Sequence, residues 1–102
     1  MQYNKLVRDK IPEIIKNQGQ IPYTRILDEE EYLLALEQKL DEEVREYHKD
    51  KSIEELADIL EVIYALAEGT GASREALLSC YESKHKKRGG FRNRIFLISK
   101  EG

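Results

Sequence analysis

Four acidic residues in two adjacent segments are the side chains of this chain best spaced to do chemistry together. They form the pairs Glu43-x-x-Glu46 and Glu55-x-x-Asp58, within residues 39–67, a stretch whose pattern indicates two helices joined by a short polar turn. Residues three apart lie on one helix face, with Cβ atoms about 5–6 Å apart. An antiparallel hairpin of these helices would therefore bring four carboxylates to one spot.

Helical periodicity places two of these acids close to the apolar faces of their helices. When residues are stepped by about 100° each, Glu43 falls inside the edge of its apolar arc and Glu46 falls just beyond it. On the second helix, Glu55 is flanked on both sides by apolar positions and Asp58 lies at the margin. Because an unpaired carboxylate is costly to bury, Glu43 and Glu55 require a compensating charge.

Carboxylates that meet in this way repel each other strongly. Two unit charges about 4 Å apart cost about 4 kcal/mol at an effective dielectric constant near 20, which is comparable to much of the stability of a small domain. Protonation, pairing with Lys or Arg, or a bound divalent cation would offset this repulsion. Oxygen ligands favour Mg²⁺, with Mn²⁺ as the other candidate. Because Cys80 and the two histidines do not stand at metal-ligand spacing, a zinc site is not expected.

Purely structural alternatives remain open for these acids. Ser52-x-x-Glu55 matches a capping box, in which the Glu55 carboxylate would accept a hydrogen bond from the backbone N–H of Ser52. In a non-catalytic helical dimerisation module, all four acids would only make interhelical salt bridges. Such a module would bind no cation and would tolerate neutral substitutions at every one of these positions.

The sequence around the acids resembles a known family. The pairs stand within KLDEEVREY and EELADILEVI, while the chain opens with YNKLVRDKIPEII and closes with KKRGGFRNRIFL. Together these segments resemble small stand-alone members of the MazG-like family of the all-α NTP pyrophosphatase superfamily, often labelled phosphoribosyl-ATP pyrophosphohydrolase-like. The resemblance covers nearly the whole chain.

This resemblance implies an all-α fold of three to four helices that binds Mg²⁺ through Glu43, Glu46, Glu55 and Asp58. The implied activity is Mg²⁺-dependent hydrolysis of a nucleoside triphosphate to a monophosphate and pyrophosphate, with attack at the α-phosphorus. Such a reaction would clear unwanted nucleotides from the cellular pool. Hydrolysis of phosphoribosyl-ATP is the alternative activity that the resemblance implies.

Three basic residues are candidates for binding the substrate phosphates, namely Arg8, Lys84 and Arg88. Arg binds phosphate oxygens through two parallel hydrogen bonds, and Lys84 and Arg88 stand one helical turn apart in the most basic part of the chain. Alternatively, Arg8 belongs to an N-terminal segment that is exposed to solvent and binds no phosphate. Alternatively, Lys84 and Arg88 only stabilise the C-terminus of a helix through their positive charge, and the glycines that follow end the helix.

Composition limits the class of protein. A chain of 102 residues is expected to form one domain, residues 1–102, and to bury somewhat more than 60% of its unfolded surface. A net charge of −3 gives no support for a nucleic-acid partner, and no apolar run is long enough to cross a membrane. Because residues 1–4 lead straight into charged positions, no signal peptide is expected. The single cysteine, Cys80, suits the reducing cytoplasm.

Periodicity and capping signals predict helices over residues 12–17, 29–49, 53–68 and 74–87. Asp28, Ser52 and Ser73 are the predicted N-caps of the last three. Residues 21–27 and 94–98 are rich in β-branched and aromatic side chains, so they are predicted to be short strands that could pair with each other.

The apolar positions of the last two helices predict further packing partners. The arc of helix 53–68 exceeds half the circumference, more than one neighbouring helix covers, so a homodimer or higher assembly is expected. The inner face of the last helix is predicted to comprise Leu77, Leu78, Cys80 and Tyr81.

Overall fold

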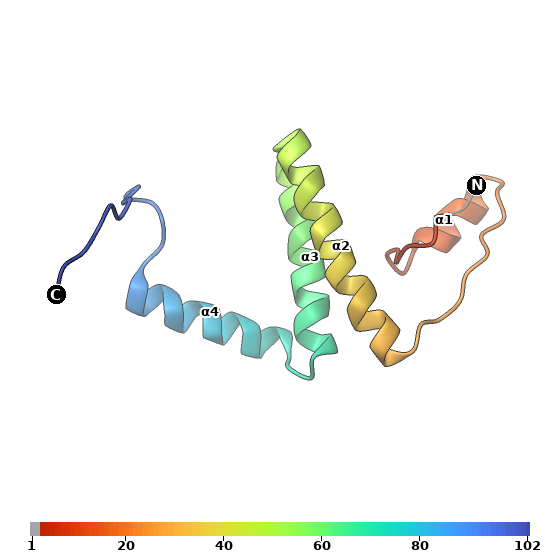
Figure 1. Cartoon of the computed structure of the whole chain (residues 1–102). Coiled ribbons are helices and arrows are strands. Elements are labelled where there is room, and N and C mark those ends of the chain that lie inside the picture. Colours follow the sequence, from red (N-terminus) through yellow and green to blue (C-terminus); the bar gives the residue numbers. More distant parts are fainter. Residues whose placement is uncertain (1–2) are drawn as a thin grey trace.

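Four helices make up the regular structure of residues 3–102, the part of the chain that the computed structural model describes (Figure 1). They are α1 (Ile11–Asn17), α2 (Glu29–Asp50), α3 (Ile53–Gly69) and α4 (Arg74–Arg88). The prediction of an all-α fold is therefore confirmed. None of these helices combines the length and the apolar character that a membrane span requires. The expectation that the chain has no signal peptide is based on residues 1–4. Two of these, Met1 and Gln2, lie outside the described residues.

The predicted N-caps set the first residues of the three long helices. The Asp28 carboxylate accepts a hydrogen bond from Glu31 N at 2.9 Å, and the Glu31 carboxylate accepts one from Asp28 N at 3.3 Å, which completes a capping box. At α4, the Ser73 hydroxyl accepts from Ala76 N at 3.0 Å. Each such cap contributes about 0.5–2 kcal/mol, so local sequence defines where these helices begin.

The centre of the molecule is an antiparallel hairpin of α2 and α3 (Figure 1). The two helices are joined by two residues, of which Lys51 adopts the left-handed conformation with φ 53° and ψ 35°. Leu36 and Val62, exposed to only 3% and 6%, are its two buried apolar side chains. At the other end of the hairpin, a Cβ atom on Gly69 would lie 2.9 Å from Leu33 Cδ2, so glycine permits the close approach of α2.

Helix α4 does not pack along the hairpin. It leaves the end of α3 after Gly71, which has φ 93°, and points away from α2 and α3 (Figure 1). Its first turn is held to α3, because the Arg74 guanidinium lies 3.8 Å from the centre of the Tyr64 ring. Cys80 and Tyr81 are exposed. Leu77 is partly buried and lines a groove with residues of α3. The predicted inner face is therefore only partly covered in a single copy of the chain.

The prediction of two strands is also wrong for the described residues. Segments 21–27 and 94–98 form no strand, and they lie on opposite sides of the hairpin (Figure 1). A strand needs a neighbour for its backbone hydrogen bonds, and neither segment finds one within the chain. Their side chains are almost fully exposed, with Ile26 at 94% and Phe96 at 87%.

A single copy therefore leaves an unusually large surface in contact with solvent. Its accessible area is 9655 Å², whereas a compact protein of its mass exposes about 6,000 Å². Its radius of gyration is 18.1 Å, against about 13 Å for a compact chain of this length. The unfolded chain would expose about 17,000 Å², so a single copy buries less than half of that area. The expected burial of more than 60% is wrong for one copy.

Candidate metal centre

Three of the four predicted acids converge near the end of the hairpin where α2 connects to α3. Glu43 comes from the second half of α2, while Glu55 and Asp58 come from the first two turns of α3. One carboxylate oxygen from each lies within 4.8 Å of the other two. The side chain of Glu43 is only 12% exposed, which agrees with its position at the edge of the apolar arc.

The fourth predicted acid, Glu46, belongs to a second group that shares Glu55 with the first. This group comprises Glu46, Asp50 and Glu55, whose oxygens also lie within 4.8 Å of one another. Asp50 was not among the sequence candidates. Its signal is the spacing Glu46-x-x-x-Asp50, which places both side chains on one face of the last turns of α2, directly before the connection to α3.

The Glu55 carboxylate is available for ligand binding. The Ser52 hydroxyl accepts a hydrogen bond from Glu55 N at 3.3 Å, which is one half of a capping box. The reciprocal bond, from Ser52 N to the Glu55 carboxylate, is not formed among the described residues, although its counterpart is present at the start of α2. The capping alternative therefore does not occupy this carboxylate.

The electrostatic state of Glu55 shows that acids dominate its surroundings. Its pKa is raised above the ordinary value of 4.5, first by partial burial and then by the negative charges of Asp50, Asp58, Glu43 and Glu46. The excess negative charge would be relieved by a bound cation.

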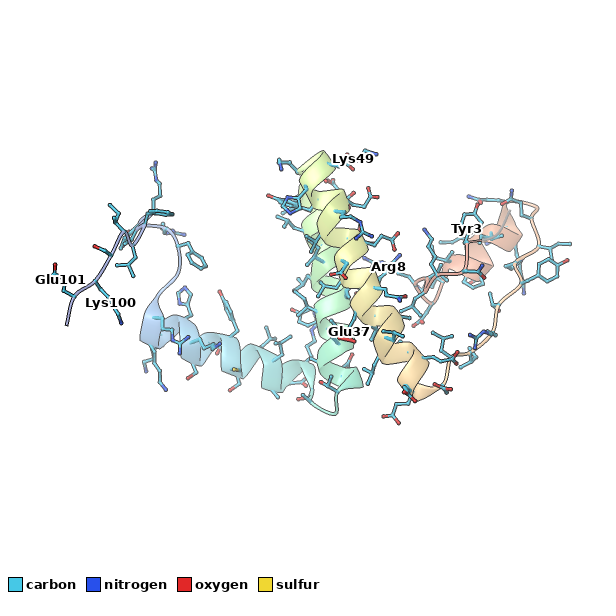
Figure 2. All side chains as sticks on the ribbon, in the orientation of Figure 1. Tyr3, Arg8, Glu37, Lys49, Lys100 and Glu101 are labelled. Carbon is cyan, nitrogen blue, oxygen red and sulfur yellow. The ribbon has the colours of Figure 1, made fainter. Side chains whose placement is uncertain are left out.

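Arg8 reaches this centre from the segment that precedes α1. Its Nη2 atom donates a hydrogen bond to Asp58 Oδ1 at 2.6 Å, and its Nη1 atom lies 3.9 Å from Glu61 Oε1. Figure 2 shows Arg8 beside the hairpin. Both partners are about half-exposed, and ion pairs of this kind contribute about 0–1 kcal/mol. Arg8 is therefore held at the site by a contact that a competing ligand can replace.

Lysines balance the acids on the α2 side of the centre. Lys39 Nζ lies 3.6 Å from Glu43 Oε1 and 3.4 Å from Glu42 Oε2. Lys5 Nζ lies 3.6 Å from the other oxygen of Glu42. Glu42 is therefore shared by two lysines and lies outside both acidic groups.

The structure does not bring the other two predicted phosphate-binding residues to this centre. Lys84 and Arg88 are exposed on α4, which begins at the end of α3 remote from the acids and points away from them (Figure 1). Within one copy of the chain these residues therefore stand apart from Glu55 and Asp58.

The carboxylates suit a small divalent cation that prefers oxygen. Oxygens bound to one Mg²⁺ at 2.0–2.1 Å lie at most about 4.2 Å apart, so small side-chain adjustments to the present spacing would suffice. Three carboxylates would fill half of an octahedral shell and leave positions for water and other oxygen ligands. Glu43, Glu55 and Asp58 would hold such an ion, and Glu46 and Asp50 with the shared Glu55 could hold another.

Comparisons with known proteins assign no activity to this centre. No protein-family model and no solved structure matches the chain. An uncharacterized protein from Mycolicibacterium smegmatis (strain ATCC 700084 / mc(2)155) is 55% identical over 42 residues, which make up 41% of this chain and 43% of that protein. The chain thus spans less than half the length of this relative.

Proposed function

We propose that the chain is a Mg²⁺-dependent nucleoside triphosphate pyrophosphohydrolase that releases pyrophosphate and a nucleoside monophosphate. The observation that carries this proposal is the convergence of Glu43, Glu55 and Asp58 from two antiparallel helices, beside an arginine. The resemblance of both acidic pairs and both chain ends to the MazG-like family supports the choice of reaction. The cytoplasm is the proposed setting, because the free thiol of Cys80 suits a reducing compartment.

Each residue has a distinct part in the proposed reaction. Mg²⁺ bound at the carboxylates would neutralise phosphate charge and lower the pKa of an attacking water. Arg8, once separated from Asp58, binds phosphate oxygens and stabilises the negative charge that develops on them. Glu46 and Asp50 make no ion pair among the described residues and lie beside Glu55, so they are the candidates for accepting the water's proton.

A pyrophosphate-release assay tests this function. Each nucleoside triphosphate, and phosphoribosyl-ATP as the alternative substrate, is incubated with the full chain in the presence and absence of Mg²⁺. The proposal predicts pyrophosphate from at least one triphosphate, and only with the cation. Turnover of phosphoribosyl-ATP alone would select the alternative substrate. No turnover, together with no effect of Mg²⁺ on the melting temperature, would instead favour a non-catalytic dimerisation module.

Arg8 is predicted to weaken cation binding while it supports turnover. Because its guanidinium occupies Asp58 at 2.6 Å, Arg8→Gln is expected to tighten Mn²⁺ binding by about 2- to 5-fold, equivalent to the 0–1 kcal/mol of such an exposed pair. The same variant is expected to lower pyrophosphate release. Isothermal titration with Mn²⁺ measures the first effect, and Lys10→Gln in the same segment is the matched control. Weaker Mn²⁺ binding in Arg8→Gln would contradict this role.

The raised pKa of Glu55 predicts how pH affects stability and cation binding. Between the ordinary pKa and the higher folded value, the folded chain binds more protons than the unfolded chain, so the free energy of unfolding falls as pH rises. Without a cation, Glu55→Gln should therefore melt at or above the wild-type temperature at neutral pH, and this difference should disappear at low pH. Mg²⁺ should raise the wild-type melting temperature less as pH falls, because protons compete for the carboxylate. Melting curves across about pH 4–8 test both trends, and a wild-type advantage without cation at neutral pH would contradict the first.

A further inference from the structure

Acidic and basic side chains are concentrated in separate segments of this chain. Residues 41–61, which contain the candidate metal centre, include nine acidic and three basic side chains. Residues 84–94, here called the basic segment, include six Lys and Arg side chains and no acidic one. The basic segment forms the end of α4 and the loop after it, far from the acids of the same chain (Figure 1). Among the described residues the basic segment makes no ion pair, whereas Arg8, Lys5 and Lys39 offset only some of the acids. The charge that remains on each segment is therefore complementary to that of the other segment in a second copy.

The basic residues of α4 share a face with its exposed apolar residues. Leu77, Tyr81, Lys84 and Arg88 are spaced by four, three and four residues, which aligns them along one side of the helix. An apolar groove of about 290 Å³ lies between α3 and α4 at the base of this face. Its lining comprises Leu60, Ile63, Tyr64, Leu77, Leu78 and Tyr81. A partner that fills this groove would also contact Lys84 and Arg88.

The size of the exposed surface indicates that a second copy of the chain occupies the groove. One copy exposes about 3,700 Å² more than a compact protein of its mass, and obligate homodimer interfaces bury about 2,000–5,000 Å² or more in total. The excess includes apolar side chains at both ends of the chain, among them Tyr23, Ile26 and Phe96. A small ligand in the groove would leave most of this area exposed.

We propose that residues 74–102, here called the C-terminal arm, clasp the hairpin of a second copy, and that the second copy does the same in return. Helix α3 rises about 1.5 Å per residue, so about 20 Å separate Glu55 from the start of the arm in its own chain. When two hairpins pair antiparallel about a two-fold axis, each arm begins beside the partner's acidic end. The apolar face of α4 is then covered, and Lys84 and Arg88 lie over the partner's carboxylates. Their part in phosphate binding rests on the function proposed above, whereas the clasp itself does not.

Sedimentation equilibrium of the full chain tests the clasp directly. The wild type is expected at about twice the chain mass of 11.9 kDa. Tyr81 is 59% exposed in one copy, so Tyr81→Glu leaves the fold of that copy intact but places a charge in the interface. We expect it to weaken the dimer by at least about 30-fold, the scale of an aromatic hot spot. Ser79→Glu adds the same charge on the opposite side of α4 and should leave the dimer unchanged. A monomeric wild type, or equal masses for the two variants, would overturn the proposal.

Mixed dimers test whether Lys84 and Arg88 act on the partner's site. Glu55→Gln chains, and chains carrying both Lys84→Ala and Arg88→Ala, are each expected to be inactive alone. The two kinds of chain are unfolded together in urea and refolded as a mixture. In a reciprocal dimer, about a quarter of all sites then combine intact acids with an intact arm from the other copy. Pyrophosphate release at about that fraction of the wild-type rate is expected. If mixed dimers form but pyrophosphate release does not recover, each arm acts on its own chain. That result would overturn the proposal that Lys84 and Arg88 act on the partner's site.

The two proposals fail in different ways. A wild-type dimer that dissociates in Tyr81→Glu and hydrolyses no nucleotide would leave the clasp standing and reject the hydrolase. A monomer that releases pyrophosphate would reject the clasp and leave the hydrolase standing.

Discussion

Replacing Glu55 by Gln is expected to lower Mg²⁺-dependent pyrophosphate release by at least about 100-fold, since even the outer partners of metal ligands contribute 10- to 100-fold to metal affinity or activity. Glu55 is the one carboxylate that belongs to both acidic groups, so this substitution removes a ligand from each. Glutamine keeps the size of the side chain and the hydrogen bond that Glu55 N donates to Ser52. Helix α3 should therefore form normally, and the loss should be confined to the cation and to turnover.

Glu54→Gln is the matched control for this variant. Glu54 precedes Glu55 in the first turn of α3, carries the same charge, is exposed to solvent and belongs to neither acidic group. Its loss should change turnover less than about 2-fold, since exposed charges away from a site contribute little. Equal activity in wild type and Glu55→Gln, measured at saturating Mg²⁺ and substrate, would exclude the proposed centre.

Replacing Leu36 by Ala is expected to lower the free energy of unfolding by about 2–5 kcal/mol, the usual cost of truncating a buried leucine. Leu36 is the most buried apolar side chain among the described residues, and it lies near Gly69, where α2 approaches α3 most closely. Because the hairpin has few buried side chains, the remaining structure offers little compensation. Cation binding should also weaken in Leu36→Ala, since the packing of α2 on α3 positions Glu43 against Glu55 and Asp58.

Urea unfolding followed by circular dichroism measures this effect. Gln38→Ala lies two residues away on the exposed side of α2 and should change the free energy of unfolding by no more than about 0.5 kcal/mol. Similar unfolding curves for Leu36→Ala and Gln38→Ala would show that the hairpin is not held together at Leu36.

Local sequence was sufficient to predict the helices and the meeting of the acids. Asp28, Ser52 and Ser73 accept backbone hydrogen bonds at the predicted helix starts. A connection of two residues can only join antiparallel neighbours, so the inner acids of α2 and α3 had to face each other. These features depend on contacts within about four residues or across a short turn, which periodicity and capping chemistry describe well.

Long-range contacts could not be predicted in the same way. The hydrogen bond from Arg8 to Asp58 spans 50 positions, and nothing in either segment specifies it. Residues 21–27 and 94–98 have the composition of strands, but a strand depends on a neighbour that one copy does not supply. The apolar face of α4 likewise requires a partner. Residue propensities and periodicity identified the apolar surfaces that need a packing partner, but they did not identify that partner.

The central claim is that α2 and α3 together hold a divalent cation. Its most direct test is Mn²⁺ binding, measured from the electron paramagnetic resonance signal of the free ion. We predict that the wild-type chain depletes the free Mn²⁺ signal, that excess Mg²⁺ restores it, and that Glu55→Gln leaves it almost unchanged. A free-ion signal that the wild type does not diminish, or that Glu55→Gln diminishes equally, would contradict the claim.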